Sequence, residues 1–171
     1  HLDRGVRCER AAWQAEFFVD QLELIQKQSK LVEVEIDALL ERVLKGTPEE
    51  PTDADILQSF PGFGPFVTSV VLVEAVEALR TRNLEDMRCL SGVAPVSTST
   101  GKKERKKLRH VQMRWAVNPQ LRNAMFHAAK SAASNDERFK AIYASQRAKE
   151  HEHARALRTV GDRMLSVLFA M

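Results

Sequence analysis

This sequence has few cysteines, few aromatic residues and no long apolar run. Its two cysteines, Cys8 and Cys89, have no CxxC spacing, which disfavours a disulfide framework or a zinc site and suits a reducing compartment. Aromatic residues make up only 6%, with a single Tyr. No apolar run approaches the roughly 18 residues that a membrane helix needs, and the start lacks the plan of a secretory signal. We therefore expect a cytoplasmic protein without membrane contact.

The sequence instead has the composition of a folded, largely helical protein and an uneven charge. Its 171 residues, 44% hydrophobic and 29% charged, suffice for one core. Residues 1–55 carry 7 basic and 13 acidic side chains, whereas residues 56–171 carry 19 and 10. The later part is therefore the one we expect to bind a polyanion. The chain begins at His1, which we interpret as a tag scar or an excised fragment.

Apolar or small residues recur in alternating steps of three and four along the first part of the chain. They are Ala11, Ala15, Phe18, Leu22, Ile25, Ser29, Val32, Ile36, Leu39 and Val43. This heptad seam, with no Gly or Pro from about Cys8 to Lys45, predicts one long helix that ends at Gly46 to Pro48. We expect residues 1–50 to form a coiled-coil arm that pairs between copies or with a missing segment. The alternative is that the seam packs on its own domain.

The fold class that we predict is all-α, with the arm followed by a compact helical domain over residues 51–171. Helix starts are indicated by Thr52, by Asn118 with Pro119, and by Asp136. The β-branched run 67–73 could be a strand by propensity, but its apolar positions fall on one helical face, so we predict a helix.

A tight turn between two of these helices has the pattern of a helix-hairpin-helix, expected over residues 54–79. The turn reads Phe60-Pro61-Gly62-Phe63-Gly64-Pro65. Glycines let the backbone approach a phosphate, and the N–H groups at the next helix start point at it. We predict DNA contact through Gly62, Phe63 and Gly64, with an ordinary helical turn as the alternative. Val67 replaces the third glycine of a dinucleotide-binding fingerprint.

A basic run follows a hydroxyl-rich loop later in the chain. Its members are Lys102, Lys103, Arg105, Lys106, Lys107 and Arg109. Such a run is commonly a solvated face, but its place after the loop favours contact with DNA phosphates, together with Arg122. We expect this run and the glycine turn to lie on a common side of the molecule.

The loop itself contains four hydroxyl residues, Ser97, Thr98, Ser99 and Thr100. By composition they favour an ordinary loop. An alcohol nucleophile in phosphoryl transfer needs cationic neighbours and a proton acceptor, and the sequence offers only the first. His151 and His153, two residues apart, would point to different faces of a helix, so we predict no metal site.

Four segments in order resemble one known family. They read "LQSFPGFGPFVTSVVLVEA", "LSGVAPVSTSTGKK", "NPQLRNAMFHAAKSAA" and "IYASQRAKEHEHARALRTVGDRMLSVLFAM". Together they resemble the C-terminal domain of the bacterial insertion-sequence transposases named after insertion sequences 110, 116 and 902. The resemblance runs from about residue 55 to the end, and the long helix before it resembles that family's coiled-coil arm.

The resemblance implies a DNA recombinase in two parts. An N-terminal RuvC-like domain would carry acidic Mg²⁺ ligands, and the C-terminal domain would supply a serine that links covalently to DNA. Members are expected to work as oligomers near the bacterial nucleoid and to use an element-encoded guide RNA. Only the second part is present in this chain, so we expect no cofactor here and no recombinase activity from the fragment alone.

The family's serine lies immediately before the glycine of a "GLxP…SG" motif, and here Thr100 occupies that place. Thr100 could serve, Ser99 could serve after a one-residue adjustment of the loop, or this copy could be inactive. The leading hypothesis is a transposase part that binds DNA phosphates and supplies a hydroxyl nucleophile for strand cleavage and transfer. The alternatives are a non-catalytic helix-hairpin-helix DNA-binding module and a coiled-coil oligomerisation scaffold.

Overall fold

The computed structural model describes residues 2–44, 46–47, 49–98 and 110–171, and it divides the chain into two compact units. The first unit ends at Leu39, and the second covers Leu40–Met171. At the start of the second unit Leu40 is only 5% exposed, and its π-helical turn packs against the next helix. None of the described helices combines the length and the apolar character that a bilayer crossing requires.

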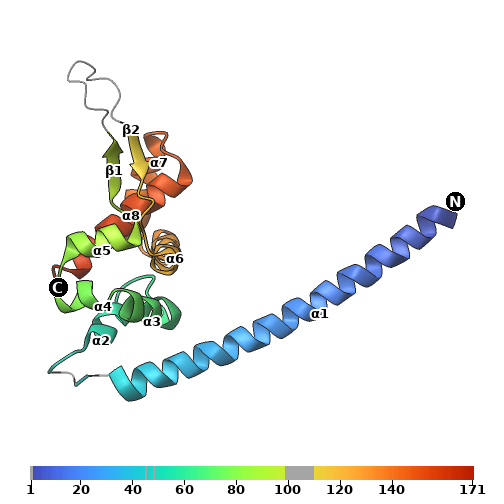
Figure 1. Ribbon diagram of the computed structural model, residues 1–171, viewed down its shortest axis with the longest axis horizontal. Coiled ribbons are helices and arrows are strands. Elements are labelled where there is room, and N and C mark those ends of the chain that lie inside the picture. Colours follow the sequence, from blue (N-terminus) through green and yellow to red (C-terminus); the bar gives the residue numbers. More distant parts are fainter. Residues whose placement is uncertain (1, 45, 48, 99–109) are drawn as a thin grey trace. The chain divides into compact units, whose positions relative to one another are not determined.

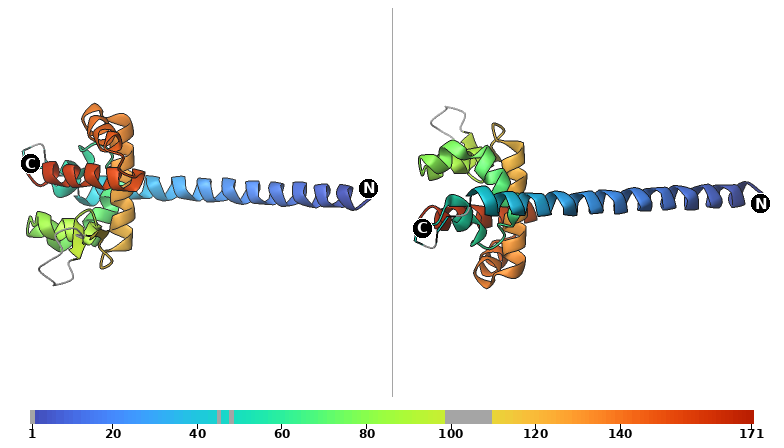
Figure 2. Two further views of the ribbon diagram at one scale, coloured as in Figure 1. Left: turned by 90° about the horizontal axis from the view of Figure 1, so that it is seen from above. Right: turned by 90° about the horizontal axis from the view of Figure 1, so that it is seen from below.

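The first unit is one helix, α1 (Leu2–Leu39), which is continuous in Figures 1 and 2. It confirms the predicted long helix, and the chain then continues into the π-helix η1 (Leu40–Leu44). Seam residues such as Phe18, Ile25 and Val32 are between 54% and 59% exposed. The seam is thus helical as predicted, and these three side chains lie exposed.

Four short helices begin the second unit: α2 (Asp53–Gln58), α3 (Pro65–Glu74), α4 (Val76–Arg80) and α5 (Leu84–Ser91). The predicted cap at Thr52 is confirmed. Its backbone N–H donates to the Asp55 carboxylate at 2.9 Å, and its hydroxyl accepts from the Asp55 N–H, which completes a capping box. The β-branched run lies in α3 and is helical, as its apolar face predicted.

A two-stranded antiparallel hairpin follows, formed by β1 (Pro95–Thr98) and β2 (His110–Met113). Pro95 pairs with Met113 and Thr98 pairs with His110. The expectation that the hydroxyl-rich segment is loop from Ser97 onward was therefore wrong for Ser97 and Thr98. Each strand spans only four residues, and its partner is remote in sequence, so no local periodicity revealed it.

Three longer helices complete the unit: α6 (Pro119–Asn135), α7 (Glu137–Ala148) and α8 (His153–Leu168). Both predicted start signals are confirmed. The Asn118 side chain accepts from the N–H groups of Gln120 and Leu121, and Asp136 accepts from those of Arg138 and Phe139.

Helix α6 lies at the centre of the second unit. Helices α3, α5, α7 and α8 all pack against it (Figure 1). Its buried alanines, Ala124, Ala128, Ala129 and Ala132, are no more than 2% exposed. Because alanine side chains are small, neighbouring elements approach this helix closely, and the core forms around it.

Candidate nucleic-acid interface

The turn between α2 and α3 is packed against α6. Gly62 has φ +87°, and a Cβ added there would collide with the carbonyl oxygen of Ala128 and lie 3.2 Å from the Ala132 nitrogen. Phe63 is 4% exposed and meets Phe60 edge-to-face at 5.9 Å between ring centroids. Gly62 and the side chain of Phe63 therefore hold the turn on the core.

Gly64, the third residue predicted to contact DNA in this turn, faces solvent. It is the N-cap of α3, no side chain caps the helix there, and nothing lies within 4 Å of an added Cβ. Pro65 occupies the first helical position, and Phe66 after it is 55% exposed. The first N–H groups of a helix have no partner within the helix, so this end of α3 can accept an anion.

The predicted nucleophiles and the basic run lie outside the described residues. Ser99, Thr100 and the run from Lys102 to Arg109 belong to the segment 99–109. The described strands flank that segment on both sides, with Thr98 opposite His110. The hairpin rises at the end of the unit opposite α2 and α3 (Figure 1). The expectation of one common side for the glycine turn and the basic run therefore gains no support from the position of the strands.

An ion-pair network fixes α5, the helix that leads to β1, against α8. Arg88 Nε donates to Asp162 at 2.7 Å, and its two terminal nitrogens donate to Glu85 at 2.6 Å and to Ser166 Oγ at 3.0 Å. The hydrogen bond that Arg88 donates to Glu85 raises the pKa of Arg88, and the negative charge of Asp162 acts in the same direction. The base of the hairpin is thus anchored by a group that remains charged.

Arg122, predicted to bind phosphate, lies on α6 beside the base of the hairpin. Its Cδ is 3.9 Å from the position of an added Cβ on Gly92, and it forms no ion pair with any residue that the structure describes. Arg114, which directly follows β2, has a buried Nε without a hydrogen-bond partner in the described part of the chain.

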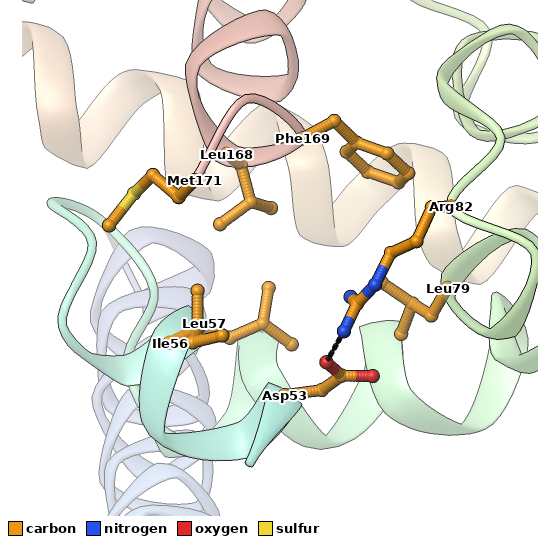
Figure 3. Close-up of a pocket in the computed structure, with 8 residues that line it drawn as sticks. All are labelled: Asp53, Ile56, Leu57, Leu79, Arg82, Leu168, Phe169 and Met171. Carbon is orange, nitrogen blue, oxygen red and sulfur yellow. Dashed lines mark hydrogen bonds and ion pairs between the residues drawn. The ribbon is translucent and has the colours of Figure 1, made fainter. Parts of the chain in front are cut away.

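Cavities open on the described part of the second unit, two of them near predicted site residues or helix ends. The first, of about 140 Å³, lies between α2, α4 and the end of α8. Figure 3 shows Leu168 and Met171 facing Ile56 and Leu57 across it. At its edge Arg82 donates to Asp53 at 2.6 Å, so the charge there is compensated. The second cavity, of about 170 Å³, lies beside Arg122.

The chain is similar to known insertion-element proteins. The model of the Transposase IS116/IS110/IS902 family matches residues 54–144. An uncharacterized 43.6 kDa protein of insertion element IS110 from Streptomyces coelicolor is 29% identical over 150 residues, which cover 88% of this chain and 34% of that protein. The mini-circle transposase described for IS117 of the same organism is 30% identical over 130 residues, 75% of this chain and 30% of that protein.

These matches define the class of the chain, which is transposase-related. The chain belongs to the Transposase IS116/IS110/IS902 family, because the family model covers more than half of it. It spans about a third of the length of the curated relatives that it matches. The family resemblance that the four sequence segments indicated is therefore confirmed, whereas the helix-hairpin-helix stays a prediction.

The two glycines of the turn should respond differently to alanine. Gly62→Ala should lower the free energy of unfolding by about 2–5 kcal/mol, because it adds backbone strain and overlap with α6. Gly64→Ala should change it by less than about 1 kcal/mol, because the site is open and φ is −76°. Urea denaturation measures both. Equal stability of the two variants would show that the turn does not pack on α6.

Proposed function

We propose that this chain is the DNA-binding, nucleophile-bearing part of a transposase that cleaves and transfers DNA strands. The observation that carries the proposal is the family match over residues 54–144, which spans both the glycine turn and the basic run. A transposase acts on DNA, so DNA is the partner that the family implies. The proposed reaction is strand cleavage by a protein hydroxyl followed by transfer of the strand.

The charge distribution supports the DNA contact. Residues 56–171 carry 19 basic and 10 acidic side chains. We assign phosphate contacts to the Lys102–Arg109 run, to Arg122, and to the open helix start at Gly64. Contacts of this kind position a strand but carry no sequence information. An element-encoded guide RNA is therefore the proposed source of target choice.

Ser99 or Thr100 is the proposed nucleophile. Either alcohol lies next to the basic run in the sequence, and cations beside a scissile phosphate stabilise the charge that develops in the transition state. The proton acceptor and the acidic Mg²⁺ ligands are assigned to a RuvC-like domain outside this chain. Two recombining strands require more than one nucleophile, which agrees with an oligomer.

A second candidate role, oligomerisation through α1, is favoured by the exposed seam. Phe18, Leu22 and Ile25 are all more than half exposed on a helix of 38 residues. Burial of one such side chain contributes about 1.5–3 kcal/mol. We therefore include a coiled-coil contact between copies in the proposed function.

Salt should weaken DNA binding steeply. If about four to six phosphates are neutralised, the logarithm of the association constant should fall with the logarithm of salt concentration at a slope of roughly −4 to −5. Changing Lys102, Lys103, Lys106 and Lys107 to Gln should reduce the slope by roughly 3 to 4. The matched control is Lys27→Gln with Lys30→Gln on α1. Fluorescence anisotropy with duplex DNA measures the slope, and binding indifferent to salt would refute the electrostatic contact.

The nucleophile can be trapped on a suicide substrate. Full-length transposase should become covalently attached to ³²P-labelled DNA, and the combined Ser99→Ala and Thr100→Ala changes should abolish the adduct, because no alcohol remains at either position. The single changes identify which residue reacts. Ser97→Ala, in β1, serves as the control and should leave the adduct intact. An adduct that persists in the double variant would disprove the assignment.

Charges placed in the seam should dissociate the chain. Ile25→Asp with Ile36→Asp buries carboxylates in any coiled-coil contact, which costs more than such a contact yields. Light scattering after size exclusion should then give the monomer mass. Lys30→Asp, on the face away from the seam, should leave the mass of the assembly unchanged. If the seam variants and the unchanged chain have the same mass, α1 does not mediate assembly.

A further inference from the structure

An indole side chain lies open to solvent at the base of the hairpin. Trp115 follows Met113, the last residue of β2, by two positions. It is 93% exposed, more than any other large apolar side chain that the structure describes. None of the ring contacts among the described residues involves it. A flat ring of a ligand can therefore reach the indole.

The backbone that carries this indole is held in place. The Trp115 carbonyl accepts from the N–H of Val117 at 3.0 Å. The N–H of Asn118 donates to the carbonyl of Leu90, in α5, at 2.9 Å. The Asn118 side chain also caps α6 and donates to Glu74 at the end of α3. Because the segment is fixed to three helices, a ligand that stacks on the indole loses little of its binding energy to ordering the chain.

Two arginines lie beside the same segment. Arg114 directly precedes Trp115 and is partly buried, so its position is restrained. A Cβ added at Gly92 would lie 2.8 Å from Val117 Cγ1 and 3.9 Å from Arg122 Cδ. Val117 and Arg122 therefore lie against the same glycine, which brings Arg122 close to the segment that carries the indole.

An accessible indole with cations beside it suits one chemical class of ligand. A nucleobase is a flat ring attached to an anionic backbone, and stacking on an aromatic side chain next to basic groups is how proteins hold single strands. Both faces of a base inside a duplex are covered by neighbouring bases. The ring that reaches the indole must therefore come from an unpaired nucleotide or from the end of a duplex.

We propose that Trp115 stacks on an unpaired nucleobase of a bound DNA strand, while Arg122 contacts an adjoining phosphate. Every base has a face that can stack, so this contact holds the strand without reading its sequence. The contact deepens the proposed function and depends on it, because it requires that the chain binds DNA.

The place of the indole in the chain gives the stacked base a role. Trp115 is five residues after His110, which directly follows the basic run, so at most roughly 18 Å of chain separate them. About five nucleotides span that length at 3.4 Å each. Phosphate contacts alone are alike at every nucleotide, so a strand can slide along them. A stacked base stops the sliding and fixes the strand at the base of the hairpin, whose strands flank Ser99 and Thr100.

Tryptophan fluorescence tests the contact directly, because the chain has only two tryptophans. In the Trp13→Phe variant of the whole chain, all indole emission comes from Trp115. An oligothymidylate of about twelve nucleotides should quench this emission, because a base stacks on the ring. An abasic oligonucleotide of the same length should bind through its phosphates without quenching. In Trp115→Phe the remaining indole, on α1, should not respond to either strand.

Affinities separate stacking from phosphate contact. Trp115→Ala should weaken oligothymidylate binding roughly five- to a hundredfold, which corresponds to the loss of one stacked base. It should leave the salt slope unchanged, because stacking releases no counterions, whereas Arg122→Gln should reduce the slope by roughly 0.7. Trp115→Phe keeps a ring and should retain most of the affinity. Trp13→Ala, the matched removal of an exposed indole, should leave the affinity unchanged.

The outcomes distinguish this contact from the proposed function. Binding without quenching, equal quenching by the abasic strand, or an unchanged affinity of Trp115→Ala would overturn the stacking contact and leave DNA binding intact. Quenching by oligouridylate but not by oligothymidylate would assign the indole to RNA and overturn it as a DNA contact. Emission that changes with protein concentration alone would assign it to a contact between copies, which also overturns it. No binding of either oligothymidylate or duplex DNA would overturn the proposed function itself.

Discussion

Close backbone approach to α6 is the constraint on which the rest of the second unit depends. A Cβ added at Gly62 would collide with the carbonyl oxygen of Ala128. A Cβ added at Gly161 would lie 3.8 Å from the Cβ of Ala129. The α2–α3 turn therefore reaches α6 at a distance that a side chain at Gly62 would prevent, whereas α8 lies in ordinary van der Waals contact with α6 at Gly161. The position of the α2–α3 turn thus depends on the glycine at position 62.

This constraint changes how the glycine turn can contribute to DNA contact. The sequence pattern treats its two glycines as equivalent, whereas Gly62 faces the core and Gly64 faces solvent. Only the α3 start at Gly64 remains open to an anion, and it lies at the end of the unit away from the hairpin (Figure 1). A strand bound at both places would have to run along the unit.

Local signals predicted much of the fold, whereas contacts between remote segments could not be predicted. The caps at Thr52, Asn118 and Asp136 determine helix starts through bonds within three residues, so the sequence predicts them correctly. The hairpin depends on pairing across the segment 99–109, and the second cavity on residues from Ser91 to Gly161, for which no local periodicity exists. The proposed nucleophile stays open between two residues, because Thr100 stands where the resemblance implies a serine and Ser99 is its neighbour.

The two units differ in what stabilises them. The second unit buries a core of its own, with Leu121, Met125 and Leu165 at 1% exposure or less. The described residues give helix α1 no such packing, although helices in proteins gain most of their stability from it. A second apolar row, Phe17, Leu24 and Leu31, repeats every seven residues beside the seam, and its members are between 48% and 70% exposed. One partner helix can cover one row, so a stable α1 calls for neighbours on more than one side. Folding of the arm and assembly of the proposed oligomer are then one coupled process, whereas the core of the second unit does not depend on it.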